Sequence, residues 1–144
     1  MGLDVGDKTI GVALSDDLLI ISQGLMTIER VGIRKDTSLI LNLVKKYVCS
    51  TIVIGLPINL DGTDSIQTQK VRDFVKLLEN KLKSNGLQDV EIVYQDERFT
   101  TTIAEKVLIE ADVSRKKRKT VIDKQAATII LQSYLDKRKN QNPN

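Results

Sequence analysis

Three widely separated carboxylates, Asp4, Glu97 and Asp123, lie where a charged side chain is unusual. Asp4 interrupts the apolar opening of the chain, and Glu97 follows a segment, 90–94, that is expected to form a strand. Asp123 shares the apolar stripe of the last expected helix with Ala127 and Ile130. A buried charge is costly unless it is paired or bound to a metal. Convergence of the three would make a divalent-cation site, which suits phosphodiester hydrolysis.

The composition restricts the chemistry that this chain can perform. It contains no histidine and one cysteine, Cys49. Serine or cysteine triads with a histidine base, histidine-ligated zinc and an intrachain disulfide are therefore excluded. Carboxylate ligands favour hard cations, so we expect Mg²⁺ or Mn²⁺. Aromatic residues make up only 3% of the chain, too few for base-stacking platforms.

Length and hydropathy are those of an ordinary globular protein. The 144 residues, 41% hydrophobic and 28% charged, fit one domain. We expect that domain over residues 1–139, followed by a disordered polar tail at 140–144. No apolar run approaches the roughly 20 residues of a membrane span, and no signal-peptide pattern is present. The expectation is a cytoplasmic protein without a membrane partner.

Hydrophobic periodicity predicts three strands at 1–6, 10–15 and 25–29, followed by alternating helices and strands. Helices are expected at 36–48, 65–83, 101–111 and 120–136, and further strands at 51–54 and 90–94. The last two helices carry capping-box patterns at Thr102 and Thr120. The order βββαβαβαα predicts an α/β fold, in which an antiparallel meander joins parallel strands in a mixed sheet flanked by helices.

Alternation along the first strand places Gly2, Asp4 and Gly6 on one face. The glycines leave open space in which a metal, a phosphate or water could approach, although an Asp that ends a strand or caps a turn is the structural alternative. Asp96 and Glu97 are adjacent and face opposite sides of extended backbone, so only one can share a site with Asp4. Periodicity alone does not choose between them.

Asp123 also has a structural alternative. A carboxylate in the first turn of a helix that begins at Thr120 is favoured by the helix dipole and by the capping box. Against this, Asp123 lies on an apolar stripe, and the neighbouring pair Ala126 and Ala127 would let the helix approach the sheet closely. The pattern leaves both interpretations open.

Positive charge is concentrated near the end of the chain. The net charge is +3, but from Asp112 onward nine Lys/Arg stand against three Asp/Glu. A basic run is expected to form a loop between the last two helices and to contact a polyanion. A solvated loop without a partner is the alternative. The candidate nucleic-acid contacts are Lys8, Arg98, Arg115, Lys116, Lys117, Arg118 and Lys119.

Five segments, in order along the whole chain, carry a resemblance to a known family. They are Gly2-Leu3-Asp4-Val5-Gly6, Gly11-Val12-Ala13, Gly55-Leu56-Pro57 with Asp61-Gly62, Asp96-Glu97-Arg98-Phe99-Thr100-Thr101, and Asp123-x-x-Ala126-Ala127-x-x-x-Leu131. They resemble the signatures of the YqgF/RuvX family of Holliday junction resolvases, whose members are also assigned to trimming the precursor of small-subunit ribosomal RNA. The resemblance implies a ribonuclease H-like fold, with acidic residues on the first strand, a later strand and the final helix.

Carried over residue by residue, the resemblance implies that Asp4, Glu97 and Asp123 are the catalytic and metal-binding residues, with Asp96 the less favoured substitute for Glu97. It implies a nuclease that uses Mg²⁺ or Mn²⁺ on structured RNA or branched DNA, and it leaves a homodimer open. This chain departs from the family at Asp7, a turn position usually held by a small or hydroxyl residue. Asp7 adds negative charge near the expected metals.

Two other functions fit the same elements. The actin, sugar-kinase and heat-shock chaperone ATPases share this fold and begin with a similar Asp-x-Gly hairpin around phosphate. They enclose the nucleotide between two such domains, whereas 144 residues supply one. A catalytically silent nucleic-acid-binding module of the same fold is the second alternative, against which the intact acidic trio argues.

Overall fold

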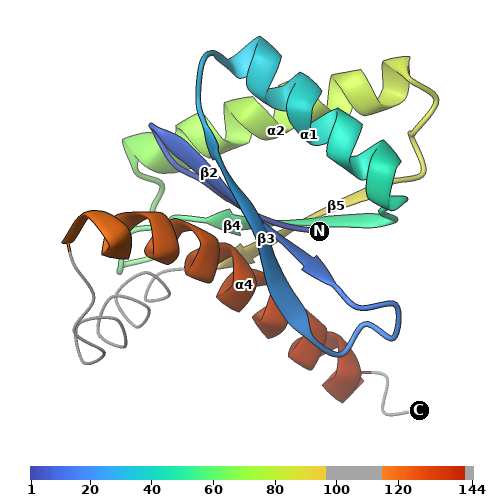
Figure 1. The fold of residues 1–144 in the computed structure, drawn as a ribbon. Coiled ribbons are helices and arrows are strands. Elements are labelled where there is room, and N and C mark those ends of the chain that lie inside the picture. Colours follow the sequence, from blue (N-terminus) through green and yellow to red (C-terminus); the bar gives the residue numbers. More distant parts are fainter. Residues whose placement is uncertain (97–114, 142–144) are drawn as a thin grey trace.

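The computed structural model describes residues 1–96 and 115–141, with side chains for 1–96 and 125–140. Within these residues, five strands form one sheet with helices on both faces (Figure 1). The strands are β1 (Gly2–Val5), β2 (Thr9–Ser15), β3 (Ser22–Glu29), β4 (Thr51–Leu56) and β5 (Glu91–Asp96). The helices are α1 (Ile33–Tyr47), α2 (Ile66–Ser84) and α4 (Arg115–Gln141).

The strand order is β3-β2-β1-β4-β5, so β1 is the central strand. β1, β2 and β3 form an antiparallel meander, whereas β4 and β5 run parallel to β1. The connections through α1 and α2 supply the crossovers that parallel strands need. The predicted α/β fold with a mixed sheet is therefore confirmed, while the helix predicted at 101–111 lies outside the described residues.

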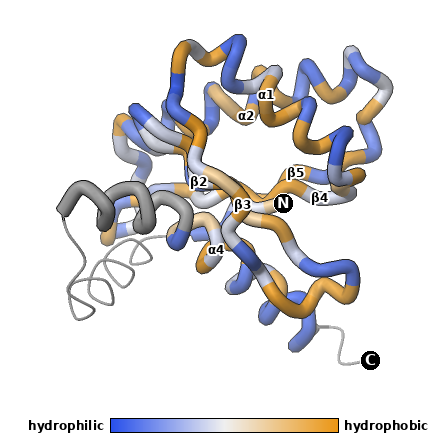
Figure 2. Tube along the Cα trace, viewed as in Figure 1, coloured by the Kyte–Doolittle hydropathy of each residue, from blue (hydrophilic) through white to orange (hydrophobic). Residues whose placement is uncertain are grey.

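The sheet separates two apolar layers (Figure 2). The larger layer packs β-strand residues such as Leu3, Ile10 and Ile54 against α1 and α2. The smaller layer packs Ala13 of β2 and Val53 of β4 against α4. The all-apolar run of β4 is explained by its central place, because both of its faces are covered. None of the described helices is long and apolar enough to cross a bilayer.

Helix α4 begins earlier than the sequence predicts. It starts at Arg115 rather than at the capping pattern of Thr120, so the basic run is helical and the prediction of a loop is wrong. Lys and Arg have high intrinsic helix propensity, and neither Gly nor Pro interrupts the run. α4 ends at Gln141, two residues into the segment 140–144 that we expect to form a tail. Residues 142–144 lie outside the described part of the chain.

α4 crosses β1 at very short range. A Cβ atom added to Gly2 would lie 2.7 Å from Leu131 Cβ and 3.0 Å from the Ala127 carbonyl oxygen. The space beside Gly2, which the sequence analysis leaves open for a ligand, is therefore occupied by α4. The predicted close approach at Ala126 and Ala127 is confirmed, because both residues are fully buried.

Gly2→Ala is expected to lower the free energy of unfolding by about 1–3 kcal/mol, the usual cost of overpacking. Leu131 Cβ cannot rotate away from the new methyl group, because it is fixed to the helix backbone. Urea denaturation of the variant and the parent measures the difference. An unchanged free energy of unfolding would show that α4 can shift away from β1 at no cost.

Candidate functional site

Asp4 lies on the central strand, on the sheet face that α4 covers. Side chains alternate along a strand, and Gly2, which contacts α4, precedes Asp4 by two residues. Asp4 pairs with Gly11 of β2. On β4, Gly55 follows the partner of Gly2, Val53, by two residues. Both neighbouring strands thus place a glycine beside the half-buried Asp4.

Hydrogen bonds from three directions hold the turn that follows Asp4. The Gly6 backbone N–H donates to the Thr9 carbonyl at 2.9 Å, which makes the β1–β2 connection tight. Arg30 Nη1, just after β3, donates to the Gly6 carbonyl at 2.9 Å. Gln67 Nε2, on α2, donates to the Val5 carbonyl at 3.2 Å. The backbone next to Asp4 is therefore fixed in position.

A buried carboxylate in turn holds Arg30. Arg30 Nε lies 2.9 Å from Asp36 Oδ2, and its guanidinium lies over the Phe74 ring at 5.5 Å. Asp36 is fully buried and also accepts hydrogen bonds from the backbone N–H groups of Val31 and Gly32, at 3.1 and 3.4 Å. Burial by itself raises the pKa of Asp36, but the hydrogen bonds from Arg30 and the two N–H groups outweigh it and hold that pKa below its ordinary value.

This network of Arg30, Asp36 and the backbone beside Asp4 leaves no recognisable pattern in the sequence. An arginine and an aspartate six residues apart, at the start of a helix, are too common a pair to single out. Nothing in the sequence shows that Asp36 is buried or that Arg30 reaches the turn beside Asp4.

Asp96, the last residue of β5, faces the other side of the sheet from Asp4. It pairs in register with Leu56 of β4, which packs in the core beneath α1 and α2. Tyr94, two residues earlier on the same face, lies under the Arg72 guanidinium of α2 at 5.5 Å. The register therefore argues against Asp96 as the partner of Asp4.

The described residues do not test whether the side chains of Asp4, Glu97 and Asp123 lie close together. Glu97 and Arg98, and the side chains of Asp123 and the basic run, lie outside what is described. Within residues 1–96 and 125–140, no three metal-ligating side chains lie together. One alternative for Asp123 is nevertheless removed, because the first turn of α4 holds no acidic residue. Asp123 is eight residues beyond Arg115, so neither a capping box nor the dipole of the first turn explains it.

The exposed β1–β2 turn carries Asp7 and Lys8. Asp7 Oδ1 pairs with Lys70 Nζ of α2 at 3.1 Å, so the additional negative charge at this turn is balanced locally. The Lys8 side chain is exposed, while its backbone carbonyl accepts a hydrogen bond from the Arg30 backbone N–H at 2.9 Å. The Lys8 side chain is therefore accessible at the Asp4 end of the sheet, and its contact with nucleic acid stays a prediction.

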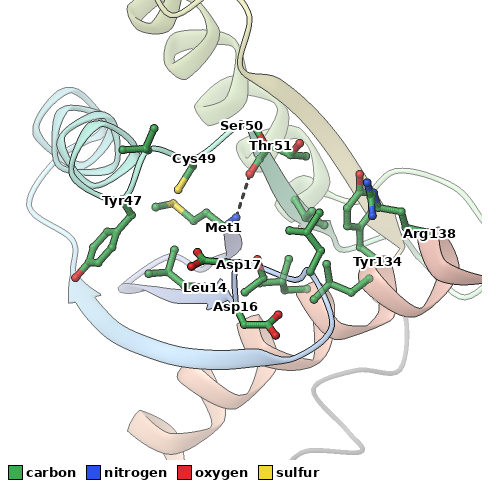
Figure 3. Close-up of a pocket in the computed structure, with 16 residues that line it drawn as sticks. Met1, Leu14, Asp16, Asp17, Tyr47, Cys49, Ser50, Thr51, Tyr134 and Arg138 are labelled. Carbon is green, nitrogen blue, oxygen red and sulfur yellow. Dashed lines mark hydrogen bonds between the residues drawn. The ribbon is translucent and has the colours of Figure 1, made fainter. Parts of the chain in front are cut away.

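A cavity of about 380 Å³ lies at the opposite end of β1, beside Met1 (Figure 3). It is bounded by the loop between β2 and β3, the end of α1 and the last turns of α4. Cys49 lines this cavity, and burial raises the pKa of its thiol. The one thiol of the chain therefore lies beside Met1, at the other end of β1 from Asp4.

Comparison with protein families matches residues 1–137 to the model described as RuvX: Holliday junction resolvase. A relative from Thermoanaerobacter pseudethanolicus is 51% identical over 142 residues, which cover 98% of each chain. Another from Natranaerobius thermophilus is 45% identical over 144 residues, which cover 100% of this chain and 98% of that one. Both relatives carry the name "Putative pre-16S rRNA nuclease".

Among solved structures, the chain resembles the Fowlpox virus resolvase in its complex with substrate Holliday junction DNA. The TM-score is 0.55 at 10% sequence identity, over 95% of this chain and 96% of that chain. At this identity the likeness concerns the fold alone. It agrees with the ribonuclease H-like arrangement that the sequence predicts.

Proposed function

This chain belongs to the RuvX family of Holliday junction resolvases, and on that premise we propose that it is a divalent-metal-dependent nuclease acting on structured nucleic acid. The names of its relatives favour precursor 16S ribosomal RNA as the substrate, and the family description favours a four-way DNA junction. Both substrates belong to the cytoplasm, where we place the protein. The observation that carries the proposal is Asp4, a carboxylate on the central strand between two strands that present glycine.

We assign the second carboxylate to Glu97. Asp96 ends β5 on the face of α1 and α2. Gln95 pairs with Gly55, which puts it on the face that carries Asp4. Because side chains alternate on extended backbone, the position two residues after Gln95 is the next one expected on that face.

We assign the third carboxylate to Asp123 because of its position along α4 relative to Ala127. Gly2 lies against Ala127, and the later residues of α4 line the cavity beside Met1, so α4 runs past β1 in the opposite direction. From Gly2 to Asp4 a strand advances by about 6.6 Å. From Ala127 back to Asp123 a helix advances by about 6 Å in the same direction. Asp4 and Asp123 are therefore displaced by similar distances, in the same direction, from the contact between Gly2 and Ala127.

The donor set fits a hard cation. The three assigned residues offer only carboxylate oxygens, which Mg²⁺ and Mn²⁺ prefer. A bound ion of this kind polarises a phosphodiester and makes water a stronger nucleophile. The contribution of this chain is a fixed position for Asp4, because hydrogen bonds from Arg30 and Gln67 hold the backbone that follows it.

The decisive experiment is a cleavage assay of the purified protein on a four-way DNA junction and on a structured precursor RNA, with Mg²⁺, with Mn²⁺ and with chelator. We expect cleavage of at least one substrate that depends on the metal. Binding of both substrates without cleavage under any of these conditions would instead identify a catalytically silent module of this fold.

The basic run at the start of α4 is expected to hold the substrate backbone, because the same helix carries Asp123. Each phosphate neutralised on duplex DNA changes the slope of log affinity against log salt by about 0.9. Changing Lys116, Lys117 and Lys119 to Gln should reduce that slope by about one to three units without changing the site of cleavage. Binding measured from low to moderate salt checks this expectation.

The matched control changes three exposed lysines elsewhere, Lys83, Lys137 and Lys139, to Gln. The net charge falls by the same amount in both variants, so a general loss of attraction would affect them equally. An equal slope in the two variants would show that the basic run makes no specific contact with the substrate.

A further inference from the structure

Exposed positive charge is concentrated on α1. Four exposed cations lie on this helix: Arg34, Lys35, Lys45 and Lys46. Its one acidic residue, Asp36, is buried and paired with Arg30. By contrast, the part of residues 1–96 outside α1 and α2 holds two Lys/Arg against ten Asp/Glu. The two helices therefore carry most of the positive charge of this part of the chain, and α1 has no exposed acidic residue to offset its own.

Helix stability does not explain the cations at the start of α1. Arg34 and Lys35 lie in its first turn, where the helix dipole disfavours positive charge. The dipole favours cations in the last turn, where Lys45 and Lys46 lie. Among the described residues, no salt bridge involves any of the four. Local stability thus accounts for one end of the helix only, whereas binding of an anion accounts for both ends.

A fifth cation, Lys81 of α2, lies against the start of α1. Its Nζ donates to Ser38 Oγ at 2.7 Å and to the Arg34 carbonyl oxygen. Lys83, two residues later on α2, instead lines a separate hollow with Glu79, next to β5. Lys81 therefore adds its charge to the α1 surface, whereas Lys83 belongs to a different side of α2.

The spacing of the charges on α1 fits an extended polyanion. Arg34 and Lys45 are eleven residues apart, as are Lys35 and Lys46, so each cation at the start lies on the same side of the helix as one at the end. The two ends of this row are about 16.5 Å apart. A small anion could touch one end only, whereas a nucleic-acid backbone can contact both. Aromatic residues make up only 3% of the chain, which favours a duplex over a single strand whose bases stack on aromatic side chains.

α1 leads away from the Asp4 end of the sheet. Arg30, just before the helix, donates to the Gly6 carbonyl in the turn that follows Asp4. Cys49, just after the helix, lines the cavity beside Met1. α1 therefore begins beside the Asp4 end of β1 and runs toward the Met1 end, on the sheet face opposite α4 (Figure 1).

We propose that the outer side of α1, together with Lys81, binds the phosphate backbone of a duplex arm that leads away from the site of cleavage. This rests on the proposed function, in that the ligand is nucleic acid, but it does not require metal-dependent cleavage. α1 and α4 cover opposite faces of the sheet, so one straight duplex does not lie along both helices. A branched or folded nucleic acid supplies a second arm for α1.

The salt dependence of binding tests the proposal, with chelator present to prevent cleavage. The probes are four-way junctions of DNA and of RNA with the same arm lengths. Changing Arg34, Lys35 and Lys46 to Gln should reduce the slope of log affinity against log salt by about one to three units on the DNA junction. The control is the variant in which Lys83, Lys137 and Lys139 are Gln, because it loses the same charge. Equal slopes in the two variants would refute the role of α1 and leave the proposed nuclease function standing.

The length of the arms tests where the duplex lies. α1 is about 22 Å long, whereas an arm of about five base pairs, closed by a hairpin loop, spans about 17 Å. Such an arm does not reach along the whole helix. The slope lost by the α1 variant should therefore be smaller on this junction than on one with arms several times as long. An equal loss on both junctions would show that no arm lies along α1 and would overturn the proposal.

Melting temperatures separate binding from a structural role. Arg34→Gln combined with Lys35→Gln should melt at or above the temperature of the parent, because the dipole disfavours cations in the first turn. A lower melting temperature with an unchanged slope would assign both residues to the fold and overturn the proposal. A parent that binds neither junction would refute nucleic-acid binding as a whole, and with it both this proposal and the proposed function.

Discussion

Asp4→Asn is expected to reduce cleavage by about 100- to 10,000-fold. Polarisation by a bound metal contributes several kcal/mol to the barrier, and each ~1.4 kcal/mol is a factor of ten in rate. The amide keeps the size and shape of the carboxylate but removes the charge that would hold the cation. The neighbouring positions are glycines, so the substitution creates no clash with side chains on the adjacent strands. Single-turnover cleavage with Mg²⁺ and with Mn²⁺ measures the loss.

Asp7→Asn is the matched control, because Asp7 is an exposed carboxylate in the same hairpin that pairs with Lys70 on the surface. It should cleave at nearly the parental rate. Parental cleavage by Asp4→Asn would refute the assignment of Asp4. ATP hydrolysis by the parent that is lost in Asp4→Asn would favour the ATPase interpretation of the fold.

Asp36→Asn is expected to lower the free energy of unfolding by about 3–5 kcal/mol, the usual cost of removing one partner of a buried ion pair. Asp36 is fully buried, and the Arg30 side chain is 18% exposed, so water cannot replace the lost charge well. In a chain of this size, the melting temperature should fall by roughly 10 °C or more. Thermal denaturation at neutral pH measures the effect.

The Arg30–Asp36 pair also predicts how the free energy of unfolding depends on pH. The pKa of Asp36 is lower in the folded chain than its ordinary value. Its contribution is therefore complete above the unfolded-state pKa, about 3.9, and disappears as the pH falls through the lower folded-state pKa. The free energy of unfolding of Asp36→Asn should therefore fall less steeply than that of the parent as the pH decreases through this range.

Asp64→Asn provides the comparison for a surface pair. Asp64 Oδ2 lies 3.2 Å from Arg72 Nε, but its side chain is 49% exposed. Its loss should change the free energy of unfolding by about 0–1 kcal/mol, because water screens exposed pairs. Equal losses for Asp36→Asn and Asp64→Asn would show that the Arg30–Asp36 pair is not effectively buried.

Local patterns predict most elements of this fold, and the differences arise where distant residues intervene. β4 and α2 are recognisable from an apolar run and from helical spacing, because both signals lie within a few residues. β3 begins at Ser22 rather than near Leu25, and the Ser22 N–H is bonded to Gln132, which is 110 residues away. Such a contact leaves no local trace. α4 begins at Arg115 rather than at the capping pattern of Thr120, because Lys and Arg have high intrinsic helix propensity.

The candidate site is likewise predictable from the sequence only where its signal is local. Asp4 stands out in sequence because a carboxylate interrupts apolar residues. From the sequence, the preference for Glu97 over Asp96 comes from the family resemblance alone, because its physical reason is the register of β5 against β4, which pairs Asp96 with Leu56. The role of Gly2 is likewise invisible in the sequence, because the neighbour that needs the missing side chain is Leu131, far along the chain.

The central position of β1 also determines the order in which this chain can fold during synthesis. The meander of β1, β2 and β3 can form from the first thirty residues, but the other edge of β1 must wait for Val53, and its α4 face for Leu131. At about 5–20 residues per second, that edge and that face stay uncovered for seconds. An unpaired strand edge is a site of aggregation, and the α4 face of the sheet carries the apolar residues Ala13 and Val53, which are buried only once α4 has formed. The nascent chain should therefore depend most on ribosome-associated chaperones before α4 emerges, and truncation before α4 should yield insoluble protein.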